Sequence, residues 1–136
     1  MAKVEKVPFI MQMEALECGA ASLCMVLAYY GKWIPLEQVR ADCGVSRDGC
    51  NARSIYRAAV SYGLKPSAFR MEPSELRKAK LPAIIHWNFN HFVVLNGFKK
   101  KCAVINDPAR GATEVSLEEF DKAFTGIVIT FETTEE

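Results

Sequence analysis

Residues 18–30 read CGAASLCMVLAYY, a run that places apolar side chains on every face of the helix that it predicts. Alanine, leucine and methionine are strong helix formers, and a helix that is apolar all round belongs in a protein core. Gly31 follows directly and ends the helix. We therefore expect a buried helix here, with other elements packed against it.

The segments on either side of this helix change in character along the chain. Residues 5–11 have an extended pattern, and two further helices are expected at 36–43 and 52–62, each followed by a glycine. Stretches rich in Ile, Val and Phe then predict strands at 64–70, 83–87, 91–98, 102–106 and 126–131, with short helices at 73–79 and 116–124. Because helices precede strands, the fold class is α+β, with an N-terminal helical part packed on a C-terminal antiparallel sheet.

Length and composition indicate a single soluble domain that covers residues 1–136. Half of the residues are hydrophobic and the net charge is +1, which gives no reason to expect nucleic acid or an anionic membrane as a partner. Five cysteines, an odd number without close pairs, favour a reducing compartment over a disulfide scaffold. The N-terminus has no signal-peptide core, and the longest apolar stretch is too short to span a bilayer.

Cys18 is a candidate nucleophile because it stands at the start of the buried helix. The N-terminus of a helix carries partial positive charge and unpaired N–H groups, and both favour the thiolate, the form of cysteine that attacks. The small residues Gly19, Ala20 and Ala21 would let a substrate approach the backbone there. A cysteine that only packs in the core fits the same position.

Two histidines, His86 and His91, are available as a base. A three-residue hairpin turn at 99–101 would place Val93 opposite Asp107. His91 is two residues from Val93, so it would share the sheet face of Asp107 at a diagonal distance that the two side chains can bridge. A two-residue turn would put them on opposite faces. The sequence places no acidic partner for His86, which we interpret as an ordinary strand histidine.

Asp107 and Gln12 each have two interpretations. Asp107 precedes a proline and lies near Gly111, which is ordinary turn chemistry, but its carboxylate would also fix the tautomer of His91 and stabilise the imidazolium. Gln12 lies six residues before Cys18. Its amide, together with the Cys18 N–H, could donate to the oxyanion of a tetrahedral intermediate; otherwise it is a polar loop residue.

Three motifs, taken together, carry a family resemblance. They are QMEALECGAA at 12–21, HFVVL at 91–95 and NDPARG at 106–111. In this combination the chain closely resembles the bacteriocin-processing cysteine peptidases, which form the N-terminal domain of peptidase-containing ABC transporters. The resemblance extends from Val7 to Phe131 and implies a papain-like fold.

The resemblance also implies roles for individual residues. Cys18 is expected to be the nucleophile, His91 the base, Asp107 the residue that orients the base and Gln12 the oxyanion donor. The residue before the catalytic cysteine is often Asp in the family, so Glu17 is a mild departure. Since all four catalytic positions are occupied, a catalytically silent relative is disfavoured.

The function implied by the resemblance is removal of the leader from ribosomally made bacteriocin or lanthipeptide precursors, after a Gly-Gly, Gly-Ala or Gly-Ser motif, coupled to export. The expected partners are the precursor, bound through its leader helix in an apolar groove, and the membrane and nucleotide-binding domains of a transporter. The expected location is the cytoplasmic face of the bacterial inner membrane. No cofactor, metal or ATP site is expected in this segment, and the isolated domain should be a monomer.

Selection of glycine requires a channel too narrow for a β-carbon, and aromatic walls provide one. Trp87 and Phe89, just before His91, are candidates, although aromatic residues at these positions also fit ordinary core packing.

Three other functions remain open on the sequence. A docking module of the same fold would bind leaders without cleaving them, and another acyl transferase or amidase would use the same triad on other substrates. A zinc-binding domain would use Cys43, Cys50, His86 or His91, but their spacing contains no tight ligand pair. Cys24, Cys43, Cys50 and Cys102 are interpreted as packing residues.

Overall fold

The computed structural model describes residues 3–14, 16–44, 51–88 and 91–133. Its helices are α1 (Cys18–Tyr29), α2 (Leu36–Cys43), α3 (Ala52–Ser61), α4 (Pro73–Leu76) and α5 (Leu117–Ala123). Its strands are β1 (Lys3–Val4), β2 (Leu64–Arg70), β3 (Ala83–Trp87), β4 (His91–Phe98), β5 (Cys102–Asp107), β6 (Gly111–Ser116) and β7 (Phe124–Thr133). The α+β class expected from the sequence is confirmed.

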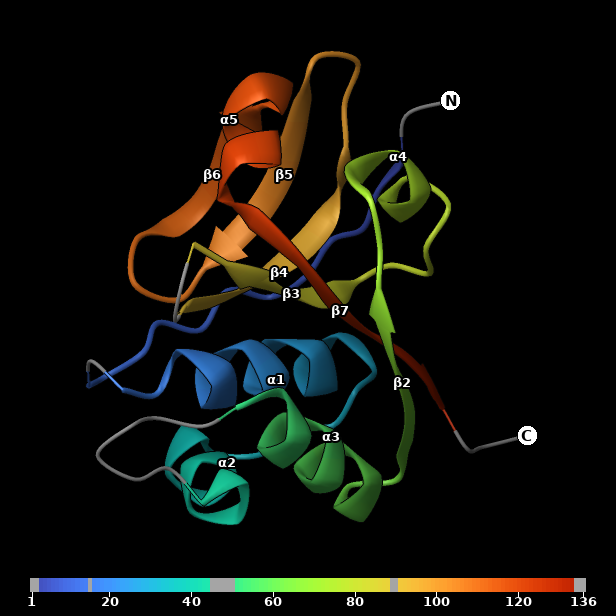
Figure 1. The fold of residues 1–136 in the computed structure, drawn as a ribbon. Helices are drawn as coiled ribbons and strands as arrows, with labels where there is room; N and C mark the ends of the chain where they lie inside the picture. Colours follow the sequence, from blue (N-terminus) through green and yellow to red (C-terminus); the bar gives the residue numbers. More distant parts are fainter. Residues whose placement is uncertain (1–2, 15, 45–50, 89–90, 134–136) are drawn as a thin grey trace.

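Helix α1 is the buried helix that the sequence predicts. Every residue from Cys18 to Ala28 is buried, and Gly31 just beyond the helix has a φ of 85°, a conformation that glycine adopts readily. Figure 1 shows α1 between the sheet and the other two N-terminal helices, α2 and α3. The sheet is antiparallel, with strand order β2-β7-β3-β4-β5-β6 and with β1 paired to β4.

The sheet separates two hydrophobic cores. Side chains along β4 alternate between them, so that Phe92 and Val94 join α1–α3 in the first core while Val93 and Leu95 join Phe120 of α5 in the second. Helix α5 lies beside β5 and β6, away from α1–α3 (Figure 1). Strand β4 is therefore buried on both faces, which explains its nearly continuous apolar sequence.

The β4–β5 hairpin corrects one expectation. The turn is one residue longer than the three-residue turn that we expected, because Phe98 pairs with Ala103. The register then shifts by one residue at Asn96, and Leu95 pairs with Ile105. A β-bulge of this kind adds one residue to one strand only. The longer turn and the bulge compensate each other, so the register beyond the bulge is the one that puts His91 and Asp107 on the same face.

Asn96 is held in this bulge by hydrogen bonds to the N-terminal segment and to the neighbouring strand β5. Its side-chain amide donates to Oδ1 of Asn106 at 3.0 Å, and its carbonyl accepts from the N–H of Glu5 at 2.8 Å. Asn106 in turn donates to the carbonyl of Val7 at 3.1 Å. The N-terminal segment is thereby fastened along the hairpin.

Three segments of the structure correct or add to the expected elements. Residues 5–11, where the sequence has an extended pattern, do not form a strand of the sheet, and Pro8, which has no N–H, cannot donate to a sheet there. The helix expected at 73–79 stops at Leu76, since the next residues continue in tighter i→i−3 hydrogen bonds. Strand β6 was not predicted, because it is a mostly exposed edge strand whose sequence GATEVS lacks an apolar pattern.

Two general properties follow from the described residues. None of the described helices combines the length and the apolar character that a bilayer span requires.

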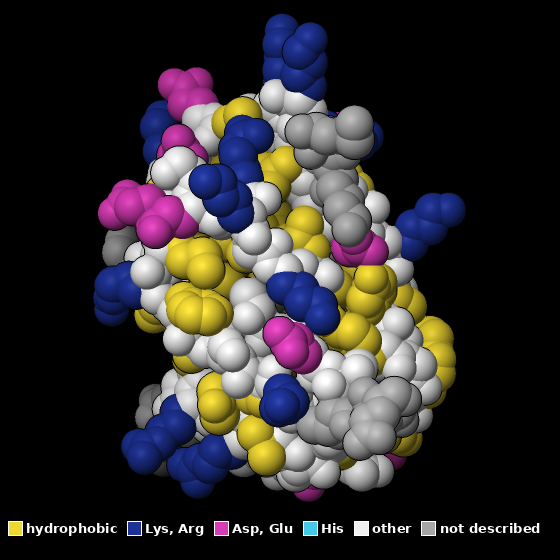
Figure 2. Space-filling view, turned by 90° about the vertical axis from the view of Figure 1, so that its right-hand side faces the viewer, with side chains coloured by type: hydrophobic (Ala, Val, Ile, Leu, Met, Phe, Trp, Pro, Cys, Tyr) yellow, Lys and Arg dark blue, Asp and Glu magenta, His cyan; other side chains and the backbone are white. Residues whose placement is uncertain are grey.

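On the face that carries β2 and α4, Figure 2 shows apolar side chains, but they are interspersed with charged ones and do not form one continuous apolar surface.

The burial of α1 generates a stability prediction. Leu27→Ala removes a fully buried side chain from the first core and should lower the free energy of unfolding by about 2–5 kcal/mol. Val60→Ala on α3, where the side chain is 52% exposed, should change it by no more than about 0.5 kcal/mol. Urea denaturation measures both. Equal effects would contradict the placement of α1 in the core.

Candidate active site

Cys18 is the first residue of α1, and its side chain is 7% exposed. The preceding residue, Glu17, occupies the N-cap position, but its side chain makes no capping hydrogen bond to the first turn. The backbone N–H groups of that turn and the positive end of the helix dipole therefore lie beside the thiol. The hydroxyl of Ser22, one turn later, donates to the carbonyl of Phe92 at 3.3 Å and fastens α1 to β4 next to His91.

His91 and Asp107 are in direct contact, as the sequence predicts. Nε2 of His91 lies 2.7 Å from Oδ1 of Asp107, and the two side chains are 23% and 8% exposed. Oδ1 of Asp107 also accepts the N–H of Ala109 at 3.0 Å, so the turn that Asp107 forms with the following residues holds the carboxylate in place. The turn role and the His91 contact are both present.

The electrostatics join Cys18 to this pair. Burial lowers the pKa of His91, but hydrogen bonds to Asp107 and Cys18, with the charges of both groups, outweigh burial and raise the pKa from 6.5 to about 9. Burial raises the pKa of Asp107, whereas His91, the Ala109 N–H and the charge of Arg110 lower it, and the net shift is downward. Since Nε2 faces Asp107, Nδ1 is the ring nitrogen left for Cys18. One imidazole therefore contacts the carboxylate of Asp107 and is influenced electrostatically by the thiol of Cys18.

Gln12 lies on the segment that leads into α1. Its backbone N–H donates to the carbonyl of Pro108 at 2.9 Å, which places it beside the Asp107 turn. Its side-chain Nε2 donates to the carbonyl of Glu14 at 3.0 Å. An amide group carries two N–H donors, so this bond is compatible with a second one to an oxyanion. The role of Gln12 as an oxyanion donor remains a prediction.

The other cysteines have different surroundings. Burial raises the pKa of Cys24 to about 11, and its thiol donates to the carbonyl of Ile34 at 3.1 Å, which keeps it protonated and inert. Cys43 is buried in the helical core and Cys102 is partly exposed, while Cys50 lies outside the described residues. The described residues contain no group of three or more His, Cys, Asp and Glu side chains placed to hold a metal ion.

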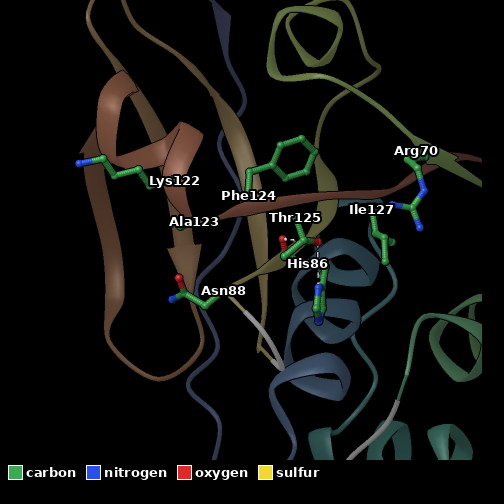
Figure 3. Close-up of a pocket in the computed structure, with 8 residues that line it drawn as sticks. All are labelled: Arg70, His86, Asn88, Lys122, Ala123, Phe124, Thr125 and Ile127. Carbon is green, nitrogen blue, oxygen red and sulfur yellow. Dashed lines mark hydrogen bonds between the residues drawn. The ribbon is translucent and has the colours of Figure 1, made fainter.

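His86 points away from the triad candidates. Its Nδ1 lies 2.9 Å from Oγ1 of Thr125, and its ring meets the edge of Phe92. Figure 3 shows His86 and Thr125 in a hollow of about 480 Å³ along β3 and β7, with Arg70 and Lys122 at its far sides. This places His86 in a hydrogen bond to the hydroxyl of Thr125.

Trp87 lies directly opposite His91 in the β3–β4 pairing. Its ring is buried against Phe120, and it also lines a hollow of about 550 Å³ together with Asp107 and Arg110. Core packing and a position beside the site therefore coexist, and a part in glycine selection remains a prediction. Phe89, the other candidate, is outside the described residues.

Sequence reasoning missed the role of Glu17 and Arg40. Glu17 is 1% exposed, and its Oε1 lies 2.8 Å from Nη1 of Arg40 on α2. Only a buried carboxylate that is paired and hydrogen-bonded is tolerated in a core. An acidic residue at the start of an apolar helix is the one signal in the sequence, but its partner 23 residues away could not be found from spacing.

Comparisons with known proteins identify relatives of the chain. The chain is 40% identical over 124 residues to the colicin V secretion/processing ATP-binding protein CvaB of Escherichia coli; the aligned region is 91% of this chain but only 18% of that protein. It is 64% identical, with a TM-score of 0.95 over 96% of this chain and 94% of that one, to a double glycine motif protease from an AMS/PCAT transporter, whose crystal structure contains the leader peptide.

A more distant structure shows the same fold. The peptidase domain of Streptococcus ComA is 23% identical and superposes with a TM-score of 0.88 over 95% of this chain and 98% of that domain. The papain-like α+β fold and the family resemblance expected from the sequence are confirmed. The model of the peptidase C39 family matches residues 6–136, and the chain therefore belongs to that family.

Proposed function

We propose that this chain is the peptidase domain of a transporter and that it removes the leader of a peptide precursor after a double-glycine motif, with Cys18 as the nucleophile. The observation that carries the proposal is the contact of 2.7 Å between Nε2 of His91 and Oδ1 of Asp107, together with the influence of Cys18, which helps to raise the pKa of the same imidazole. Nucleophilic catalysis by cysteine needs a thiolate, a proton carrier beside it and a group that orients the carrier. These three requirements are met by Cys18, His91 and Asp107.

The charges suggest how the reaction begins. With a pKa of about 9, His91 carries a proton at neutral pH and stabilises a thiolate at Cys18. The thiolate attacks the carbonyl carbon of the second residue of the Gly-Gly motif and forms a tetrahedral oxyanion. The Cys18 N–H at the helix N-terminus and the Gln12 amide would donate to that oxygen.

In the remaining steps, which form and hydrolyse the thioester, His91 gives up a proton and then regains one. The C–N bond breaks as His91 gives its proton to the departing amine, which leaves the leader as a thioester on Cys18. Neutral His91 then takes a proton from water, and the hydroxide attacks the thioester. Collapse of the second tetrahedral intermediate releases the leader as a carboxylic acid, which loses its proton to solvent, and restores the thiolate and the imidazolium.

The substrate class is supported by the relatives. The protease with 64% identity was solved with a leader peptide, and CvaB is named for both secretion and processing. By analogy, the substrate of this chain is a ribosomally made precursor of the bacteriocin or lanthipeptide type, bound through its leader helix. Residues 1–136 would form one domain of a longer protein that also holds membrane and nucleotide-binding domains, and the cleavage would occur at the cytoplasmic face of the membrane.

The nucleophile is tested by Cys18→Ala. Turnover of a Gly-Gly precursor should fall by about 10⁴-fold or more, while the affinity for a labelled leader should change little. Mass spectrometry measures cleavage and fluorescence polarisation measures binding. Cys24→Ala removes a thiol from the same helix and is the matched control, which should keep its turnover. Cleavage by Cys18→Ala at the wild-type rate would rule out the mechanism, and a wild-type protein that binds leaders without cutting them would be a docking module.

The pH dependence follows from the raised pKa of His91. A group whose pKa rises from 6.5 to about 9 stays charged between those values, so kcat/KM should decline as the pH passes about 9 and the imidazolium loses its proton. Asp107→Asn removes the carboxylate that stabilises this charge, and the alkaline decline should move toward neutral pH. The control Glu114→Gln, which breaks an exposed ion pair with Lys99, should leave the profile in place. If kcat/KM of Asp107→Asn declines at the same pH as that of the wild type, Asp107 does not control the ionisation of His91.

A further inference from the structure

The carboxylate of Glu17 is the most deeply buried acidic group in the described residues, with 1% of its surface exposed. Both of its oxygens are engaged. Oε1 accepts Nη1 of Arg40 at 2.8 Å, while Oε2 accepts the backbone N–H groups of Met13 and, at 2.9 Å, Glu14. A buried carboxylate with this set of partners is expensive to desolvate, and replacement by an apolar residue would serve stability equally well in many proteins. Stability alone therefore does not explain why a buried carboxylate lies beside the nucleophile.

The hydrogen bonds of Glu17 lead to Gln12. Glu17 holds the N–H of Glu14, and the carbonyl of Glu14 accepts Nε2 of Gln12 at 3.0 Å. The Gln12 backbone is fixed from the other side by the carbonyl of Pro108, at 2.9 Å. The side-chain amide of Gln12 is thus oriented by a residue that Glu17 holds, and Glu17 is itself bonded directly to Cys18 in the chain.

Arg40 supplies the counter-charge from a separate helix. It lies in the last turn of α2, and its Nη1 is 2.8 Å from Oε1 of Glu17 and 3.9 Å from Oε2 of Glu14. Without Arg40, a bare carboxylate next to Cys18 would repel the thiolate. The guanidinium neutralises that charge and fixes the orientation of the carboxylate at the same time.

We propose that the Glu17–Arg40 pair is a positioning device for the oxyanion donor: it holds the backbone at Met13 and Glu14 so that Gln12 presents its amide to the developing oxyanion. Glu17 is a positioning residue and not a catalytic one, because both carboxylate oxygens are occupied and its side chain is closed to substrate. The inference rests on the proposed function, in which Gln12 is the oxyanion donor.

The test replaces Glu17 by its closest neutral analogue. In Glu17→Gln one acceptor oxygen becomes an NH₂ group, so the side chain can no longer hold both Arg40 and the two backbone N–H groups. We expect kcat for a Gly-Gly precursor to fall by about 10-fold or more, up to the loss of about 10²–10³ expected for Gln12→Ala, with little change in KM. Glu17→Asp keeps the charge and should recover part of kcat. Glu37→Gln, which neutralises an exposed acid on α2, is the matched control and should keep kcat.

Two readouts separate positioning from a purely structural effect. In a Gln12→Ala background, Glu17→Gln should cost no more than about 2-fold further, because the group through which it acts is already gone. Alkylation of Cys18 by iodoacetamide forms no oxyanion, so its rate in Glu17→Gln should stay within about 3-fold of the wild type while kcat falls. Losses of kcat that multiply in the double variant, or alkylation that slows in parallel with kcat, would overturn the proposal.

A second variant covers the case in which Glu17→Gln does not fold. Arg40→Lys keeps the charge but loses the planar guanidinium contact, and it should reduce kcat in the same non-additive way with Gln12→Ala. An unchanged kcat in Arg40→Lys and Glu17→Asp, with Gln12→Ala slow, would sink this inference alone. Retained cleavage by Cys18→Ala would instead defeat the proposed function itself.

Discussion

The register of the β4–β5 hairpin is the constraint on which the site depends. His91 and Asp107 lie at the far end of that hairpin from its turn, so a slip of one residue anywhere between would put their side chains on opposite faces of the sheet. The bulge at Asn96, held by Asn106 and by the N–H of Glu5, sets this register. The contact of 2.7 Å between imidazole and carboxylate is a consequence of backbone geometry far from the chemistry.

The second requirement is that a helix N-terminus meets the hairpin at the correct point. The apolar residues of α1 bury it against β4, and the Ser22–Phe92 hydrogen bond fixes its position along the strand. The carboxylates beside the site are then neutralised by cations: Asp107 by protonated His91 and Arg110, and Glu17 by Arg40. These cations offset the negative charges around Cys18, whereas burial raises the pKa of Cys24 on the same helix to about 11 and keeps its thiol protonated.

The sequence predicted the helices, most strands and the contact of His91 with Asp107, because apolar patterns and strand parity are local properties. The place of Cys18 beside that pair was expected from the family resemblance and not from a local pattern. It missed the bulge at Asn96, since a bulge is stabilised by partners from distant segments, and the expected pairing was right beyond Asn96 only because the turn was also longer by one residue. It missed β6, whose edge position removes the apolar pattern. The Glu17–Arg40 pair could not be predicted, because an ion pair between residues of separate segments produces no periodic pattern in the sequence.

The charge state of His91 is the most direct test of this account. The chain has two histidines, so imidazole NMR spectra recorded between about pH 5 and pH 10 resolve one group at the site and one reference, His86. The account predicts that His91 keeps its proton until about pH 9 and that Cys18→Ala lowers this value while His86 is unaffected. A His91 that titrates near its ordinary pKa of about 6.5 and ignores the loss of the Cys18 thiol would contradict it.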